Sequence, residues 1–160
     1  MTPEELIAQL RDPGVPFTER RDRIARLPDS RATIAAALDK ATAAADWEAV
    51  EYLLMAAAAQ PDPGYVPALS RALRSGERQV PVEDALEVLA AIADPGTVGL
   101  LKDVALTEHD WDEFDQIGMK AVRALRRIRT PESTSALAEL AERGSENVRA
   151  LAGETVENRR

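Results

Sequence analysis

Residues 63–73 read Pro-Gly-Tyr-Val-Pro-Ala-Leu-Ser-Arg-Ala-Leu. A proline suits the start of a helix, because its fixed φ matches the first turn and its missing N–H would find no partner there. Leu69 follows Pro63 by six residues, and Ala72 and Leu73 follow it by nine and ten, so these side chains share one helix face. The stretch therefore predicts a helix that buries one apolar face.

The same pattern recurs along the chain. Three further prolines precede predicted helices, and the four are spaced by 35, 32 and 36 residues: Pro28, Pro95 and Pro131. A large aliphatic residue again follows each of them by six positions: Ile34, Leu101 and Leu137. A period of about 30 to 40 residues is typical of stacked arrays, in which each unit buries its apolar face on its neighbours.

Apolar residues at intervals of three and four, bounded by cap residues, predict ten short helices and no strand. We expect them at about residues 2–12, 18–27, 28–44, 46–59, 65–75, 81–93, 96–106, 111–129, 132–143 and 146–157. Thr2 with Glu5, Thr18 and Asp46 are the expected N-terminal caps. The expected core includes Ile34, Leu38, Leu53, Leu69, Leu73, Leu86, Leu89, Leu101, Ile117, Leu125, Leu137 and Val148.

Composition excludes several classes of function. The 160 residues include no cysteine, which excludes disulfides, thiolate zinc sites and thiol catalysis. The net charge of -8 disfavours binding to nucleic acids and to anionic membranes, and favours basic partners. No apolar stretch is long enough to cross a membrane, and Met1 to Asp12 lack the zones of a signal peptide, so we expect a cytoplasmic protein.

Catalytic motifs are also missing. His109 is the only histidine, so a single chain can form no histidine pair. Hydroxyl residues such as Ser70, Ser75 and Ser145 lie at caps or on helices without a base nearby in sequence. The glycines are isolated turn residues and form no phosphate-binding loop. We therefore expect no enzyme activity, no cofactor and no metal.

Acidic residues concentrate in one segment. Residues 32–122 hold 16 acidic and 6 basic residues. The densest run is Glu108-His109-Asp110-Trp111-Asp112-Glu113-Phe114-Asp115. One interpretation is structural: Asp110 or Asp112 caps the next helix, the other acidic residues favour its positive end, and Trp111 and Phe114 pack into the core. A second makes Trp111 an aromatic anchor in an acidic patch for a basic partner. A third is a metal site of Asp110, Asp112, Asp115 and His109, although the ligand spacing is irregular.

Another segment has similar residues. Asp46-Trp47-Glu48 begins the fourth predicted helix much as Asp110-Trp111-Asp112 begins the eighth. This similarity favours equivalent structural positions, and it leaves open that both tryptophans line one groove. Glu51, together with Glu83, Asp84 and Glu87, would then add carboxylates to an acidic ridge, or these residues form ordinary solvated helix faces.

One basic strip contrasts with this acidic background: Arg123, Arg126, Arg127 and Arg129. The strip can contact phosphate, or its arginines can pair with acidic residues of neighbouring helices or face water. The acidic surroundings and the lack of stacking aromatics favour the second interpretation.

The chain resembles the HEAT-repeat family, including its bacterial lyase-type branch, over about residues 28–157. Asp62-Pro63-Gly64-Tyr65-Val66-Pro67-Ala68-Leu69 is similar to the start of the family's first helix, and Glu146-Asn147-Val148-Arg149-Ala150 to the start of its second. Family members often carry an arginine after the valine of the second helix; Arg149 matches this position, whereas Asp115 occupies it in the preceding repeat. The resemblance implies an α-solenoid with an extended binding face and no catalytic residue.

We thus predict an all-α, right-handed α-α superhelix of about ten helices in five pairs. It would form a single HEAT-like domain over residues 1–160, with a capping pair at 1–27 and about four repeats at 28–157. The predicted function is non-enzymatic binding of a basic protein through an acidic concave face, by a monomer or weak homodimer. The predicted contact residues are Trp47, Glu48, Glu51, Glu108, Asp110, Trp111, Asp112, Phe114 and Asp115. The alternatives are an immunity or inhibitor protein that neutralises a basic toxin or nuclease, and an enzyme such as a HEAT-type lyase or DNA glycosylase.

Overall fold

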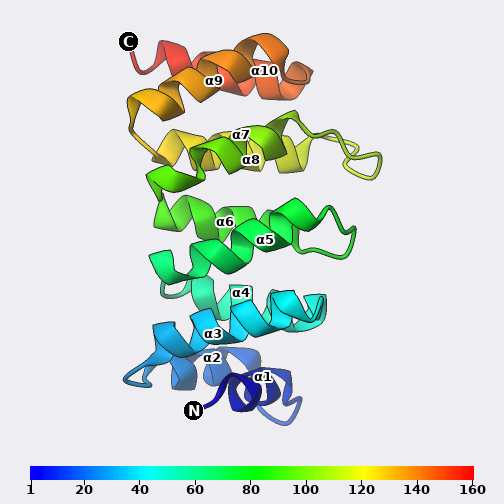
Figure 1. Ribbon diagram of the computed structural model, residues 1–160, viewed down its shortest axis with the longest axis vertical. Helices are drawn as coiled ribbons and strands as arrows, with labels where there is room; N and C mark the ends of the chain where they lie inside the picture. The colour runs from blue at the N-terminus through cyan, green and yellow to red at the C-terminus, as the bar shows by residue number, and fades with distance from the viewer. The chain divides into compact units, whose positions relative to one another are not determined.

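The computed structural model describes residues 1–160 and contains ten α-helices, two short 3₁₀ helices and no strand (Figure 1). The all-α prediction is therefore confirmed. The chain divides into two compact units, residues 1–88 and residues 89–160. Helix α6, Val82–Ile92, contains the boundary between them. None of the helices is long and apolar enough to span a membrane.

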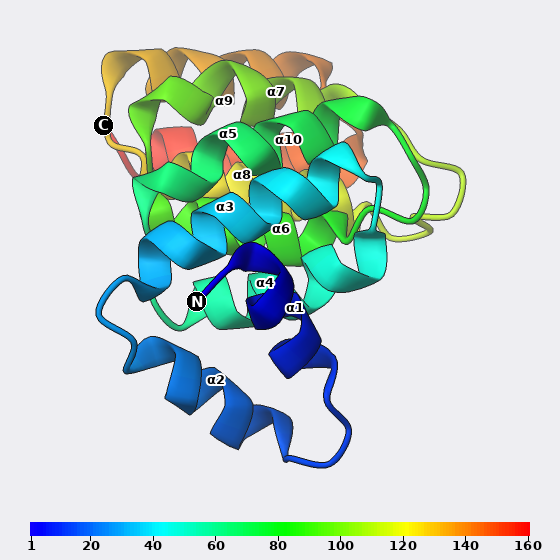
Figure 2. The ribbon, with the colours of Figure 1, turned by 60° about the horizontal axis from the view of Figure 1, so that its bottom comes forward.

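The first unit consists of helices packed around α3. Its elements are α1 (Pro3–Arg11), α2 (Phe17–Ala25), α3 (Ser30–Ala43), α4 (Trp47–Ala58), η1 (Pro63–Tyr65), α5 (Val66–Ser75) and the first part of α6. Helix α3 contacts α1, α4 and α5, and α2 lies at the outer side of this group (Figure 2). Fully buried leucine and isoleucine side chains fill the interior, and they include Leu6, Ile34, Leu53 and Leu69. The small, aliphatic composition suits such close helix packing.

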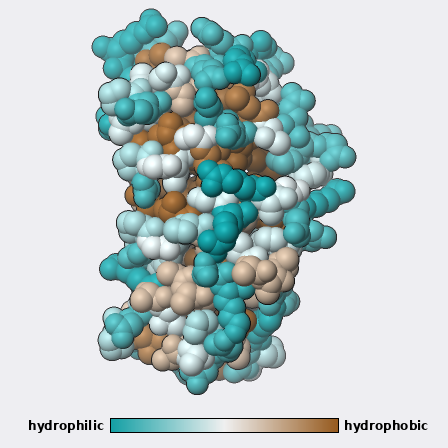
Figure 3. Space-filling model, in the orientation of Figure 1, coloured by the Kyte–Doolittle hydropathy of each residue, from teal (hydrophilic) through white to brown (hydrophobic).

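The second unit contains two helical hairpins. Its elements after α6 are η2 (Pro95–Thr97), α7 (Val98–Leu106), α8 (Gln116–Arg127), α9 (Pro131–Arg143) and α10 (Glu146–Glu157). Helices α7 and α8 pair, α9 and α10 pair, and the hairpins stack so that α7 lies beside α9 and α8 beside α10 (Figure 2). Figure 3 shows hydrophobic atoms between hydrophilic side chains over α7 and α9.

Two glycines fix the close approach of α8, α9 and α10. A Cβ atom on Gly118 would lie 2.7 Å from Cγ2 of Val148, and one on Gly144 would lie 2.5 Å from its Cγ1. Both distances are shorter than carbon atoms tolerate, so only glycine fits beside this buried valine. Val148, which the sequence places in the core, therefore packs directly against backbone.

The residue two positions after each repeat proline is buried and carries a hydroxyl group, which supports the repeat found in the sequence. Ser30 Oγ donates to Gln60 Oε1 at 2.7 Å, and Tyr65 Oη donates to the Gln60 carbonyl at 3.1 Å. Thr97 Oγ1 donates to the Asp94 carbonyl and Ser133 Oγ to the Leu125 carbonyl, each at 2.7 Å. Each hydroxyl is thus satisfied, which removes the cost of burying it.

The predicted core is confirmed except at Leu73, which is half-buried in the last turn of α5. The predicted N-cap of α2, Thr18, and the predicted start of α8 were wrong. Helix α2 begins at Phe17, because Pro16 takes the N-cap position and its carbonyl accepts from the Glu19 and Arg20 amides. Helix α8 begins at Gln116, five residues later than residue 111. The residues before Gln116 form a loop instead of a first helical turn.

Candidate functional site

The acidic segment forms a loop, residues 107–115, that joins α7 to α8 and projects from the helices of its unit (Figure 1). Asp112 organises its end: Oδ1 accepts from the Gln116 amide at 2.8 Å and Oδ2 from the Ile117 amide at 2.9 Å. The predicted capping role of Asp112 is therefore confirmed, although Asp115 occupies the N-cap position. Asp115 has φ of 53°, a left-handed conformation that stops the helix from extending backwards.

Both aromatic side chains of the loop are exposed. Trp111 is 40% and Phe114 65% accessible, so the prediction that they pack into the core is wrong. With α8 starting at Gln116, neither residue lies on a helical face that could turn toward the interior. The Trp111 ring packs against the His109 ring in a tilted arrangement, with ring centroids 4.5 Å apart and an interplanar angle of 34°. The loop thus presents apolar surface in an acidic setting, which is the arrangement expected of an aromatic anchor.

The five carboxylates of the loop fall into two groups. Asp112 caps α8, and Asp115 accepts from Asn147 Nδ2 of α10 at 3.4 Å. Glu108, Asp110 and Glu113 are exposed and make no hydrogen bond or ion pair. Nothing in the folding of this unit uses these three charges, so they are available to a partner. The loop does not gather its histidine and carboxylates into a group that could hold a metal ion.

The corresponding segment of the first unit is built differently. Asp46 is the N-cap of α4, as predicted, and its carboxylate accepts from the Ala49 amide at 3.2 Å. Arg11 of α1 pairs with Asp46 at 2.7 Å and with Glu48 at 2.8 Å. Trp47 Nε1 donates to Glu77 Oε2 at 2.8 Å. These residues hold α1, α4 and the 76–80 segment of the same unit together.

The predicted equivalence of Trp47 and Trp111 is therefore wrong at the local level. Trp47 is the first residue of α4, whereas Trp111 lies in a loop five residues before α8 begins. Of the acidic residues predicted beside Trp47, Glu48 is neutralised by Arg11 and Glu51 is exposed on α4. Among the predicted contact residues, the structure brings together those from Glu108 to Asp115.

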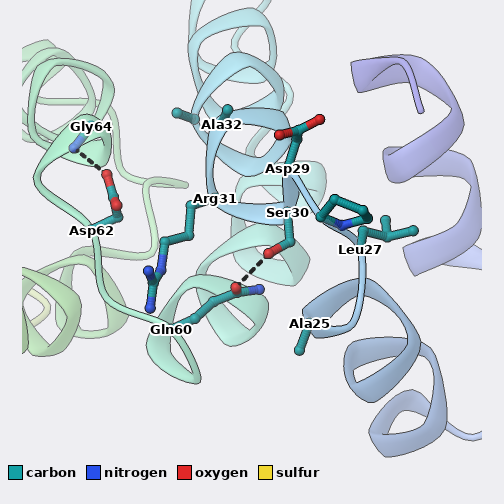
Figure 4. A pocket seen from close by; sticks show the side chains of 11 residues that line it. Ala25, Leu27, Asp29, Ser30, Arg31, Ala32, Gln60, Asp62 and Gly64 are labelled. Carbon is teal, nitrogen blue, oxygen red and sulfur yellow. Dashed lines mark hydrogen bonds between the residues drawn. The ribbon is translucent and has the colours of Figure 1, made fainter.

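Two pockets lie where a repeat proline starts a helix, and sequence reasoning missed both. The first, of about 660 Å³, surrounds the start of α3 in the first unit (Figure 4). Its walls combine Asp29, Arg31 and Asp62 with the Ser30–Gln60 hydrogen bond, and Figure 4 shows Arg31 extending between Asp62 and Gln60. The walls of this pocket therefore carry both signs of charge, from two carboxylates and one guanidinium group.

The second pocket, of about 790 Å³, lies in the second unit where α8 ends and α9 begins. Arg126, Arg129 and Arg159 line it, and no acidic residue does. The four-arginine sequence pattern indicated this region, but Arg159 lies just after α10 and no local pattern connects it with α8.

No protein-family model matches the chain, and no curated protein matches it either. A functional assignment therefore has to come from the geometry of the loop and of the pockets.

Proposed function

We propose that this chain is a non-enzymatic protein-binding module and that loop 107–115 contacts a partner with a basic surface. The observation that carries the proposal is the exposure of Trp111 and Phe114 beside the unpaired carboxylates of Glu108, Asp110 and Glu113. Tryptophan and other aromatic anchors dominate the binding energy of many protein interfaces. Unpaired surface charges add little to the stability of the fold, but they accelerate encounter with an oppositely charged partner.

The loop is also suitably presented. Asp112 and Asp115 fix its end to α8 and α10, so the aromatic side chains start from a held backbone. A held loop loses less conformational freedom on binding than a free one does, which favours affinity. The contacts of Asp112 and Asp115 therefore hold the backbone that carries Trp111 and Phe114.

The wider architecture belongs to the same proposal. We propose that the helical hairpins continue into a right-handed, HEAT-like α-solenoid, in which an extended acidic face surrounds the loop. The regular spacing of the repeat prolines and the stacking of α7–α8 on α9–α10 support it. In this proposal Trp47, Glu48 and Glu51 support that face, and the protein acts in the cytoplasm as a monomer or weak homodimer without nucleic acid, membrane, metal or cofactor.

A peptide-display selection against the purified chain tests the binding proposal. Selected peptides should combine lysine or arginine with large apolar residues. Trp111→Ala with Phe114→Ala should weaken their binding by about tenfold or more, because truncated aromatic anchors cost about 2 kcal/mol or more. Glu108→Gln, Asp110→Asn and Glu113→Gln together should mainly slow association, and this effect should shrink as salt rises.

A matched control removes three charges elsewhere in the second unit. Glu142, Glu154 and Glu157 are exposed on α9 and α10, and their replacement by glutamine should leave binding nearly unchanged. Equal weakening by the control would show that net charge alone drives binding. Selected peptides that bind the aromatic double variant as tightly as the parent chain would overturn the proposed site.

A further inference from the structure

The pocket at the end of α8 is formed by three segments of the second unit. Arg126 and Arg129 come from the end of α8 and the residues after it. Thr130, Pro131, Thr134 and Ser135 come from the start of α9, and Asn158 and Arg159 directly follow α10. In Figure 1 the α8–α9 connection and the C-terminal end lie at the same edge of this unit. The volume of about 790 Å³ lies within the range of small-molecule sites, about 300 to 1,000 Å³.

Arg159 forms the fixed wall of this pocket. Its Nη2 donates to the carbonyls of Leu125, Arg126 and Ile128 at 3.2, 3.0 and 2.9 Å, and its Nη1 donates to Thr134 Oγ1 at 2.9 Å. These carbonyls belong to the last turn of α8 and to the residue after it, where helical partners run out. All acceptors are neutral, so the positive charge of Arg159 is uncompensated. Burial and the charge of Arg129 both lower the pKa of Arg159.

The remaining wall carries hydrogen-bond donors without partners. Arg126 and Arg129 are exposed and make no ion pair, and the side chains of Ser135 and Asn158 make no hydrogen bond. No aspartate or glutamate lines the pocket. Three guanidinium groups, the amide of Asn158 and the hydroxyls of Thr130, Thr134, Ser135 and Thr155 therefore line one space in a chain whose net charge is -8.

We propose that this pocket binds the phosphate group of a small phosphorylated molecule. A guanidinium group can donate two parallel hydrogen bonds to two oxygens of one phosphate group. Such charge-assisted hydrogen bonds are about twice as strong as hydrogen bonds between neutral groups. Arg126 and Arg129 bind the phosphate oxygens, Ser135 and Asn158 supply further donors, and Arg159 contributes fixed positive charge behind them.

The acidic character of the chain decides between a small ligand and a nucleic acid. A nucleic acid carries negative charge along its whole length, and a protein of net charge -8 would repel it at long range. A small phosphate ester enters the pocket alone and meets only the local positive charge. Stabilisation of the α8 dipole explains basic residues in its last turn, but it does not explain why the arginines line a space with no acidic residue.

Isothermal titration calorimetry of the full chain with inorganic phosphate and with pyrophosphate, in low-salt buffer, tests the proposal. Saturable binding at one site is expected, and Arg126→Gln with Arg129→Gln should weaken it by about tenfold or more. Arg123→Gln with Arg127→Gln is the matched control, since both residues are exposed on α8 and neither lines the pocket. The control should weaken binding by less than about twofold.

A second variant keeps the test decisive should the double variant lose its helical signal. Ser135→Asp places a carboxylate in the pocket on the exposed side of α9 and should abolish phosphate binding while the circular dichroism spectrum stays unchanged. Absence of saturable binding, or equal weakening by both arginine pairs, would overturn the proposal. Tighter binding of a single-stranded oligonucleotide than of pyrophosphate, lost in the Arg126 and Arg129 variant, would also overturn it and identify a nucleic-acid surface.

Discussion

The two ends of helix α8 carry side chains of opposite charge. At each end, one charged side chain binds backbone groups of the helix, and the other charged side chains do not. At the start, Asp112 accepts from the amides of Gln116 and Ile117. At the other end, Arg159 donates to carbonyls of the last turn. One charged side chain closes each end, and both have the sign that complements the helix dipole.

Each end also holds more charge than closing the helix requires. Glu108, Asp110 and Glu113 surround the exposed aromatic residues at the start, and Arg126 and Arg129 line the pocket at the end. Charged residues near a helix end therefore belong to two classes, those that hydrogen-bond to backbone groups and those that do not. The charges that satisfy backbone groups explain stability, and the remainder mark the surfaces on which binding is proposed.

The largest effect on stability is expected from Arg159→Leu. It removes the donors to the Arg126 and Ile128 carbonyls and to Thr134 Oγ1, and one of the donors to the Leu125 carbonyl. It should lower the free energy of unfolding by about 3 kcal/mol. Urea titration followed by circular dichroism measures this change. Arg159→Lys should restore only part of the loss, because an ammonium group cannot span the same acceptors. A loss below about 1 kcal/mol for the leucine variant would mean that water replaces the guanidinium at little cost.

The next effect is expected from Asp112→Ala at the other end of α8. Loss of its cap should cost about 1 to 2 kcal/mol of unfolding free energy, since the amides of Gln116 and Ile117 lose their acceptor. Asp110→Ala is the control within the same loop, because Asp110 is exposed and makes no hydrogen bond or ion pair. The stability of this variant should stay at that of the parent chain. Equal losses of unfolding free energy in the two variants would show that the charge that caps the helix and the charges that do not cap it are equivalent.

The smallest effect is expected from the surplus charges themselves. Neutralising Glu108, Asp110 and Glu113 together, or Arg126 and Arg129 together, should change the unfolding free energy by less than about 0.5 kcal/mol. The same urea titrations measure it, beside the binding experiments in which these variants are expected to associate more slowly or to bind more weakly. A large loss of stability in either variant would show that its charges are structural and would weaken the corresponding binding proposal.

Local patterns predicted the helix starts that depend on neighbouring residues. Thr2 and Glu5 form the expected capping box, and Asp46 caps α4, because each contact spans only three residues. The start of α8 was missed for a related reason. Any of several aspartates in residues 110–115 could cap a helix, and the sequence alone does not show which carboxylate turns toward which amide.

The candidate sites were predictable to different degrees. Acidic and aromatic residues that are consecutive in sequence marked loop 107–115, but their exposure depended on where α8 begins. The basic strip in the sequence indicated Arg126 and Arg129 on one side of the pocket. The opposite side depends on Arg159, which hydrogen-bonds to the carbonyl of Leu125, 34 residues earlier in the sequence. No periodicity within one helix encodes such a contact.

The amino-acid sequence by itself determined the all-helical fold, its proline-spaced repeat and most of its buried leucines, because apolar periodicity and helix capping act over a few residues. Only the tertiary structure decided which charges are neutralised and which remain available. Ion pairs such as Arg11 with Glu48, and backbone contacts such as those of Arg159, form between segments that the packing of helices brings together. Their partners are therefore set by distance in space, which local sequence patterns do not record.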